Sequence, residues 1–273
     1  MEARRAVALG LVILLAAPWG LEAQRRGRGG NRDRGAYERL YEIVESGDYS
    51  KFNLPYDGRF TFVRLRFTPL EIWGGGRQGP EWSHDYPVGE QNYMKIMREV
   101  TGLRPHVDGS NILAADDPEL FKYPVAYLCE PGFWTVTPKE ATSLRAYLEK
   151  GGFLIFDDFE GEHWFNFEEK MHQVLPGAQF VKLDPSHPIF HSFFDIDDLE
   201  PLSHDNYRSR RSPAVFYGIF EGNDPNKRLM VIVNYNNDIG EDWEWSGTGF
   251  YPIELSNEGY KLGVNYIIYA LTH

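Results

Sequence analysis

YPVAYLCEPGFWTVTPKEATSLRAYLEKGGFLIFDD, from Tyr123 to Asp158, is the segment that identifies the fold class. It begins with a continuous apolar run, Val125–Cys129, which is typical of a strand buried on both faces. Thr137, followed by a proline and by Glu140 at the third helical position, predicts a capped helix that ends at two glycines. A second apolar run then ends in two aspartates. Strand, helix and strand in this order predict a βαβ unit with parallel strands and a right-handed crossover.

The rest of the chain continues the alternation of strand and helix patterns. We expect strands at 60–67, 178–183, 214–222 and 228–237, and helices at 37–44, 88–102, 166–175 and 258–273. The strands at 214–222 and 228–237 flank a turn, which favours an antiparallel pair near the C-terminus. No internal repeat is present, so the pattern predicts one α/β domain over 37–273 with a mostly parallel, doubly wound sheet.

Residues 1–23 predict export across a membrane. Arg4 and Arg5 precede a twelve-residue apolar run, Ala6–Ala17, which suits a signal-peptide core better than a bilayer span. Ala23 offers a small residue for cleavage, and an uncleaved N-terminal membrane anchor is the alternative. The Arg/Gly-rich residues 24–36 are expected to form a disordered linker. We therefore expect a periplasmic or secreted domain that is not embedded in the membrane.

The charge of the chain limits the classes of partner. The whole sequence has 28 basic and 40 acidic residues, and residues 1–36 contain seven of the basic and three of the acidic ones. Residues 37–273 therefore carry 21 basic and 37 acidic side chains, a net charge of −16. Such a surface repels nucleic-acid phosphates and favours cations, basic partners or neutral ligands. The single cysteine, Cys129, excludes an intramolecular disulfide and a cysteine-based zinc site.

Polar segments follow several predicted strands, where an open parallel sheet binds its ligands. These segments are GPEWSHDYP, CEPGFW, DDFEGEHW and NYNNDIGEDWEW. From them we select as candidate binding residues Trp82, Asp85, Tyr86, Glu130, Asp157, Asp158, Asn234 and Asp238. Their carboxylate, amide and aromatic groups suit a carbohydrate, a peptide or an envelope protein as partner.

A metal site and a catalytic site are the alternatives to this binding site. The segment after the second apolar run offers oxygen and nitrogen ligands, and its oxygens suit calcium or magnesium: Asp157, Asp158, Glu160, Glu162 and His163. The spacing matches no EF-hand, and a solvated loop is the favoured interpretation. No cofactor is therefore predicted. Cys129 has bulky neighbours and is interpreted as the last buried residue of its strand rather than a nucleophile. Glu130 and Asp158, on adjacent strand ends, are the pair that glycoside hydrolysis would use.

Several segments taken together resemble the bacterial family called domain of unknown function 4159. They are WSHDYP, the βαβ segment, HPIFHSFFDI, VNYNNDIGEDWEW and GVNYIIYAL, and the similarity extends over roughly Phe60 to His273. The resemblance implies a class I glutamine amidotransferase-like fold, a flavodoxin-like three-layer sandwich, and no established reaction. Amidotransferases of that fold use a cysteine elbow and a His-x-Glu pair. Cys129 stands on a different turn and GEHW reverses the His/Glu order, so glutaminase activity is not expected.

Three functions remain open from the sequence. The favoured one is a non-catalytic protein of the cell envelope that binds a ligand or a partner at the strand ends. The first alternative is a hydrolase, with or without a cation, that acts on a carbohydrate or another envelope substrate through Glu130, Asp157, Asp158 and Asp238. The second alternative is a structural envelope protein that is held by its basic tail.

Overall fold

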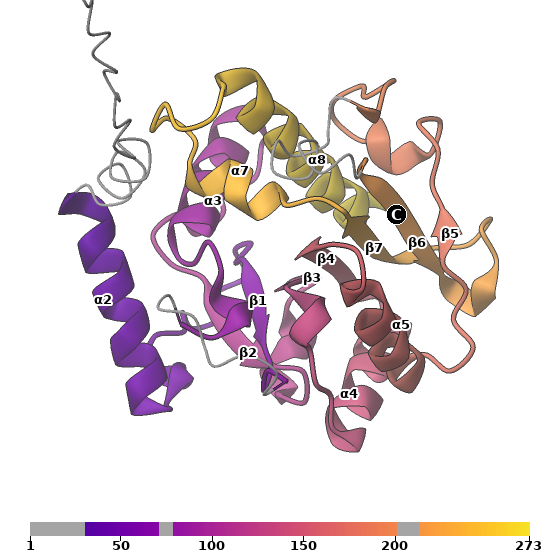
Figure 1. Ribbon diagram of the computed structural model, residues 1–273, viewed down its shortest axis with the longest axis horizontal. Helices are drawn as coiled ribbons and strands as arrows, with labels where there is room; N and C mark the ends of the chain where they lie inside the picture. Colours follow the sequence, from indigo (N-terminus) through magenta and orange to yellow (C-terminus); the bar gives the residue numbers. More distant parts are fainter. Residues whose placement is uncertain (1–30, 71–78, 201–212) are drawn as a thin grey trace, which may run out of the picture.

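A central sheet with helices on both faces organises the chain (Figure 1). The computed structural model describes residues 31–70, 79–200 and 213–273. The predicted signal peptide at 1–23 and the predicted linker up to residue 30 lie outside the described residues. The described sheet has seven strands in the order β2-β1-β3-β4-β7-β6-β5.

Five neighbouring strands of the sheet are parallel, and the last two complete it in antiparallel fashion. The strands are β1 (Val63–Arg66), β2 (Asn111–Ala114), β3 (Val125–Cys129), β4 (Phe153–Phe159), β5 (Val181–Lys182), β6 (Val215–Phe220) and β7 (Leu229–Tyr235). β6 runs antiparallel to β7, and β5 antiparallel to β6. The expected mostly parallel sheet with a C-terminal antiparallel pair is confirmed, and the layout is consistent with a flavodoxin-like arrangement.

Helices cover both faces of the sheet. The α-helices are α2 (Asn31–Ser46), α3 (Val88–Val100), α4 (Pro138–Glu149), α5 (His163–Val174), α7 (Ile239–Glu244) and α8 (Ile253–Thr272). The short 3-10 helices are η1 (Tyr49–Lys51), η2 (Glu81–Ser83), η3 (Pro118–Lys122), η4 (Pro131–Phe133), η5 (Pro188–Phe190) and η7 (Glu221–Asn223). One core cluster joins α2, α4 and α5 to one face of the sheet, and a second joins α3, α7 and α8 to the other (Figure 1).

The βαβ unit forms as the sequence predicts. β3 and β4 pair in parallel from Val125 with Phe153 to Cys129 with Asp157. The side chain of Thr137 accepts a hydrogen bond from the Glu140 amide at 3.2 Å, and Glu140 accepts one from the Thr137 amide at 2.8 Å. This capping box satisfies two amides that the first turn of α4 would otherwise leave without partners. The strand ends at Glu130 and Asp158 are thereby fixed side by side.

Some elements differ from the prediction, for reasons of length. β2 has four residues and α7 has six, so neither gives a periodic pattern that the sequence alone reveals. β5 has two residues instead of the six expected. α2 begins at Asn31, inside the predicted linker, and Leu40 and Ile43 anchor it in the core.

Within the residues that the structure describes, no helix combines the length and the apolar character that crossing a membrane requires.

Candidate functional site

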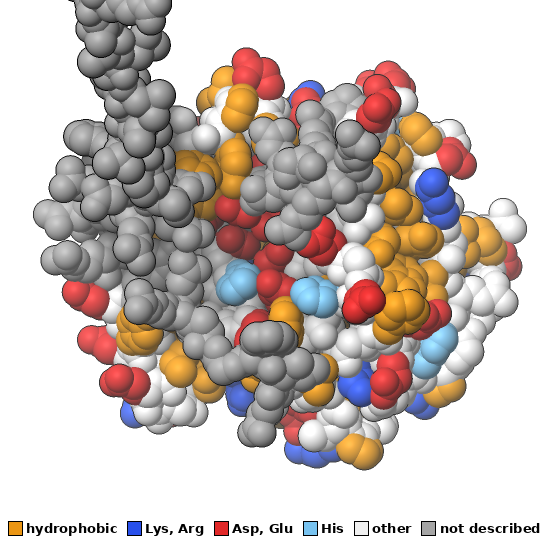
Figure 2. Space-filling model, in the orientation of Figure 1, with side chains coloured by type: hydrophobic (Ala, Val, Ile, Leu, Met, Phe, Trp, Pro, Cys, Tyr) orange, Lys and Arg blue, Asp and Glu red, His pale blue; other side chains and the backbone are white. Residues whose placement is uncertain are grey.

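Four segments bring acidic side chains to the carboxyl edge of the parallel strands. Glu130 follows β3, Asp158 lies near the end of β4, and Asp238 follows β7 and caps α7. Asp85 lies between η2 and α3, directly after His84. Figure 2 shows acidic side chains gathered in a hollow near the middle of this face, with histidines at its border. The hollow therefore lies where α/β sheets of this type bind their ligands.

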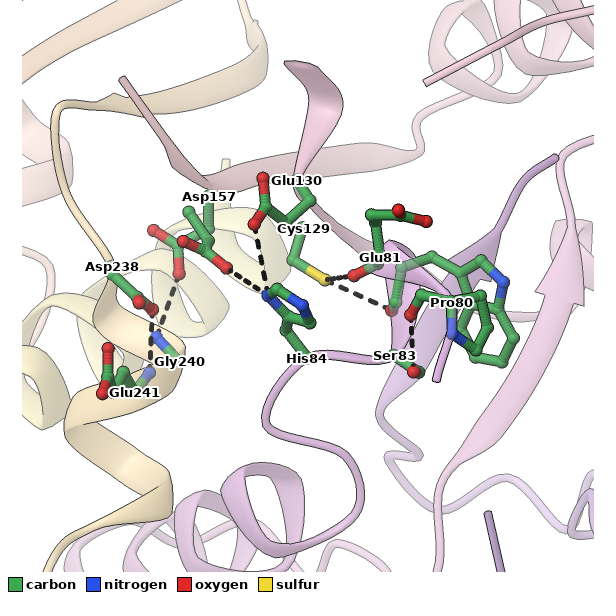
Figure 3. Close-up of polar contacts among 12 residues, drawn as sticks. Pro80, Glu81, Ser83, His84, Cys129, Glu130, Asp157, Asp238, Gly240 and Glu241 are labelled. Carbon is green, nitrogen blue, oxygen red and sulfur yellow. Dashed lines mark hydrogen bonds and ion pairs between the residues drawn. The ribbon is translucent and has the colours of Figure 1, made fainter. Parts of the chain in front are cut away.

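His84 joins two of these carboxylates. Its Nδ1 lies 3.2 Å from Glu130 Oε1 (Figure 3). The same atom lies 3.1 Å from Asp158 Oδ2. Burial opposes a charged imidazole, but the hydrogen bonds to Asp158 and Glu130 raise the pKa of His84 to about 11. The side chain keeps 36 % of its surface exposed, so solvent screens part of this attraction. One ring nitrogen thus faces two carboxylates at the mouth of the hollow.

Three aspartates form a second group beside the first. One carboxylate oxygen each of Asp85, Asp158 and Asp238 lies within 4.8 Å of the others. Burial first, and then the charges of Glu244 and Asp158, raise the pKa of Asp85 well above its usual value. Burial, Asp158 and Asp85 likewise raise the pKa of Asp238. Carboxyl groups are therefore crowded where the ends of β4 and β7 meet the loop before α3, and without a cation this crowding favours their protonated form.

One carboxylate oxygen of Asp85 could accept a hydrogen bond but receives none from the described residues. Its Oδ2 is buried, and no described residue donates a hydrogen bond to it. A buried polar atom of this kind costs about 1–3 kcal/mol when it has no partner. A Cβ atom added at Gly240 would lie 2.5 Å from this oxygen, so Gly240 leaves the space that Asp85 occupies.

The backbone is strained at three of the site residues. Asp85, Glu130 and Asp158 have φ values of 62°, 49° and 60°, in the left-handed region that residues with a side chain seldom adopt. Each such residue costs on the order of 1–3 kcal/mol and persists because its surroundings hold it in place. The fold therefore holds these three carboxylates in fixed positions at an energetic cost.

Asp157 lies beneath the hollow and holds the elements that form it. Its carboxylate accepts hydrogen bonds from the Tyr127 hydroxyl at 2.9 Å, Asn234 Nδ2 at 3.1 Å and the Gly240 amide at 3.0 Å. Burial, together with the neighbouring charge of Asp158, raises the pKa of Asp157 to about 7. Asn234 in turn accepts a hydrogen bond from the Tyr266 hydroxyl at 2.7 Å. This network ties α7 and α8 to the ends of β3, β4 and β7.

A known family covers the sheet and nearly all of the helices that follow β1. The family model described as Domain of unknown function (DUF4159) matches residues 61–271. The chain belongs to this family. The match includes every strand of the described sheet and each residue of the two carboxylate groups, whereas α2 precedes it. No curated protein matches the chain.

Cys129 of this DUF4159 domain is a buried part of the strand. Its Sγ lies 2.9 Å from Arg64 Nη1, which donates to it, and the thiol donates to the Trp82 carbonyl at 3.2 Å. Burial raises the pKa of Cys129 well above its usual value, although Arg64 opposes this effect. The residue with left-handed geometry after β3 is Glu130, so a carboxylate stands where a nucleophile elbow would present its nucleophile.

The predicted site residues separate into three sets. Asp85, Glu130, Asp158 and Asp238 converge in the hollow, whereas Asp157 and Asn234 lie beneath it as buried supports. Trp82 and Tyr86 are 2 % and 4 % exposed and pack in the core, which leaves their rings little surface for a ligand.

His84 is a site residue that the sequence places in a polar strand-end segment but that was not selected as a candidate ligand. It lies in the segment GPEWSHDYP, but no partner at helical spacing marks it as a ligand. Its partners, Glu130 and Asp158, are 46 and 74 residues away in the chain, so only the fold brings them together. His163, the histidine considered at the sequence level, begins α5, and its ring packs against Phe133 at a centroid distance of 4.8 Å.

Proposed function

We propose that this domain binds a divalent cation at the strand ends and uses it to hydrolyse a substrate of the cell envelope. The observation that carries the proposal is the convergence of His84, Asp85, Glu130, Asp158 and Asp238 from four segments of the chain. In each of two groups of three, the ligand atoms lie within 4.8 Å of one another. Atoms bound to one ion at about 2.0–2.5 Å are at most about 4–5 Å apart, so the spacing fits a shared ion.

The types of donor also suit a divalent ion. Carboxylate oxygens are preferred by Mg²⁺, Ca²⁺ and Mn²⁺, and an imidazole nitrogen with carboxylates suits Zn²⁺ or Mn²⁺. The buried Oδ2 of Asp85, to which no described residue donates, would gain a partner on ion binding. The strained backbone at Asp85, Glu130 and Asp158 has the character of a pre-organised site.

The chemistry follows from the position of the ligands. A bound divalent cation would polarise a substrate oxygen and promote ionisation of a water molecule at neutral pH. On ion binding, the Nδ1 of His84 would give up the proton that it shares with Glu130 and Asp158 and would bind the cation as a neutral nitrogen, with these two carboxylates as neighbouring ligands. Asp157 takes no direct part in this proposal, since donors from Tyr127, Asn234 and Gly240 occupy its oxygens.

The envelope location and the substrate class are part of the same proposal. Export is supported by the apolar segment Ala6–Ala17 behind Arg4 and Arg5. The net charge of −16 over residues 37–273 favours a neutral substrate, such as a glycan or its ester, over a polyanion.

Metal-free protein tests the proposal. After treatment with EDTA, thermal melting is measured with Mn²⁺, Zn²⁺, Mg²⁺ and Ca²⁺, and hydrolysis is assayed on aryl glycosides, acetylated glycans and simple esters. We expect a rise in Tm with at least one cation and cation-dependent hydrolysis of at least one substrate. Asp238→Asn should reduce both, whereas Asp224→Asn, in an exposed turn at the other end of β7, should reduce neither. Absence of any cation effect on Tm would refute the site.

A cation-dependent binding protein without catalysis is the second candidate. An aromatic group beside α7 supports it: Phe250 contacts Trp245 and Tyr251 at ring centroid distances of 5.1 and 4.8 Å and is 44 % exposed. The Tyr251 hydroxyl donates to Glu241 Oε1 at 2.8 Å. Aromatic rings of this kind stack on sugars. Glycan binding without turnover, lost in Phe250→Ala, would favour this candidate over the hydrolase.

A further inference from the structure

We propose that the strand-end site holds two divalent cations bridged by the carboxylate of Asp158. This inference rests on the proposed cation binding and adds the number of ions and their arrangement. The two groups of candidate ligands are His84, Glu130 and Asp158, and Asp85, Asp158 and Asp238. Each group satisfies the spacing of a common ion by itself, and Asp158 is the residue that belongs to both.

The two groups offer different sets of donors. The first supplies one imidazole nitrogen and two carboxylates, and its His84 Nδ1 already lies 3.1–3.2 Å from an oxygen of each acid. The second supplies carboxylates alone. Nitrogen-containing sets suit Zn²⁺ or Mn²⁺, and sets of oxygens suit Mg²⁺, Ca²⁺ or Mn²⁺. Mn²⁺ is therefore the one ion that suits both positions and serves as the probe.

A carboxylate oxygen of Asp85, which does not belong to the first group, is a separate observation that supports an ion in the aspartate group. Asp85 Oδ2 is buried, and no described residue donates a hydrogen bond to it. It lies against Gly240, on the α7 side of the site, where a Cβ atom would approach it to 2.5 Å. A single ion between His84 and Glu130 would leave this oxygen without a partner. An ion in the aspartate group, to which Asp85 contributes a carboxylate oxygen, would give this carboxylate a partner.

The geometry of Asp158 suits a bridge. A carboxylate has two oxygens and binds one ion through both or two ions through one each. Paired ions that share ligands lie about 3.5–4 Å apart and act together on the attacking and the leaving oxygen of a substrate. Asp158 stands between the two groups, and its left-handed backbone, φ 60°, fixes the direction of its side chain. The strand β4 thus provides the central ligand.

Titration of the metal-free full chain with Mn²⁺ tests the inference, with calorimetry for stoichiometry and electron paramagnetic resonance for the distance between ions. We expect two ions per chain and, at saturation, the broadened spectrum of an exchange-coupled pair. Asp238→Asn should bind one ion through His84, Glu130 and Asp158, with the spectrum of an isolated Mn²⁺. His84→Gln should bind one ion in the aspartate group, and Asp158→Asn should lose the coupling and weaken both positions by at least tenfold.

The possible outcomes separate the two proposals. One ion per wild-type chain, or two without exchange coupling, would overturn the bridged pair and leave the proposed cation-dependent function in place. No bound ion would overturn both. Asp224→Asn is the matched control, because it removes an exposed aspartate at the opposite end of β7 and should keep two coupled ions. Circular dichroism of each variant shows whether the fold is retained, and the two single-site variants keep the test decisive if Asp158→Asn fails to fold.

Discussion

Two groups of ionisable side chains lie close together in this domain and are built differently. In the first, the Arg64 guanidinium donates to Glu90 Oε1 at 2.7 Å, to the Trp82 carbonyl at 3.0 Å and to Cys129 Sγ at 2.9 Å. In the second, the strand-end site, the cationic partner of Glu130 and Asp158 is the imidazole of His84.

The difference indicates which group is structural. Both side chains of the Arg64–Glu90 pair are 2 % exposed, and the guanidinium keeps its charge at any pH that the protein meets. His84 is 36 % exposed and can lose its proton, and the neighbouring Asp85 Oδ2 accepts no hydrogen bond from a described residue. The Arg64 group therefore holds β1, β3 and α3 together, whereas the strand-end site can exchange protons for a cation.

The largest effect is expected where the structural group is broken. Arg64→Met should destabilise the fold by about 3–5 kcal/mol, because it leaves the carboxylate of Glu90 buried without its cation. Urea unfolding measures this loss, provided that the slope of the unfolding free energy against urea concentration is the same in the variant and wild type. Asp158→Asn, in the metal-free protein, should cost much less. An equal loss in the two variants would show that both groups are structural and would break the comparison.

The next largest effect is the loss of cation-dependent stabilisation. A cation at 100 times its Kd contributes about 2.7 kcal/mol, which corresponds to about 5–10 °C in Tm for a chain of this size. Asp158→Asn should abolish this rise, since Asp158 belongs to both groups of ligands. Arg64→Lys, where it folds, should keep the rise in Tm. A variant at Asp158 that still responds fully would place the cation elsewhere.

The pH dependence of stability should distinguish Glu130 from an exposed acid. Burial and Asp158 raise the pKa of Glu130 to about 7 from 4.5. The folded state thus keeps a proton that the unfolded state releases above about pH 4.5, so Glu130 reduces the stability of the metal-free protein as pH rises towards 7. Glu130→Gln removes this ionisable group and with it the loss of stability. The free energy of unfolding of the variant, relative to that of wild type, should therefore increase by about 1–3 kcal/mol from pH 5 to pH 8.

Asp224 provides the control of opposite sign. Hydrogen bonds from Asn226 lower the pKa of Asp224 in the folded state. This residue therefore stabilises the fold at pH values above its unfolded-state pKa, and the stabilisation is lost as the pH falls through its folded-state pKa. Asp224→Asn should therefore lose stability relative to wild type as pH rises. Chemical denaturation of both variants and of wild type at pH 5 and pH 8 gives the change with pH of each variant's stability relative to wild type. Equal changes in the two variants would contradict the raised pKa of Glu130.

A smaller effect is expected from the glycine beside Asp85. Gly240→Ala would place a Cβ 2.5 Å from Asp85 Oδ2 and 2.8 Å from the Tyr127 hydroxyl, so the carboxylate must move. We expect cation affinity to fall about tenfold, which is about 1.4 kcal/mol, with the fold retained. Calorimetric titration measures the affinity. Unchanged affinity would exclude Asp85 from the ligands.

The smallest effect belongs to a helix cap that lies outside the site. Thr137→Ala removes one half of the capping box of α4 and should cost about 1 kcal/mol of stability. Cation affinity should stay unchanged, because none of the candidate ligands lies on α4. A parallel loss of affinity would mean that cation binding merely reports overall stability.

The sequence predicts the fold well where patterns are long and poorly where elements are short. The buried runs of β3, β4 and β7, and the Thr137 cap, each indicate their element directly, because burial on both faces requires continuous apolar residues. The four residues of β2 and the six of α7 carry no comparable period. Parallel sheets bind ligands beyond the carboxyl ends of their strands, and this rule led to Glu130, Asp158 and Asp238, because each lies at or just after the end of a recognisable strand.

The remaining features of the site depend on contacts between distant parts of the chain. Asp157 and Asp158 are adjacent and chemically identical, yet one accepts three hydrogen bonds beneath the site and the other faces His84. Only the register of β4 and the left-handed φ of Asp158 distinguish them. His84 could not be selected for a related reason, because its role depends on the positions of Glu130 and Asp158 across three elements.

The most direct test of cation binding is a Mn²⁺ titration of metal-free wild-type protein beside Asp158→Asn, followed by calorimetry. The structure leads us to expect saturable binding to wild type that EDTA reverses, and binding at least tenfold weaker in Asp158→Asn. Equal binding by the two proteins, or no binding by wild type, would contradict the assignment of the strand-end carboxylates as a cation site.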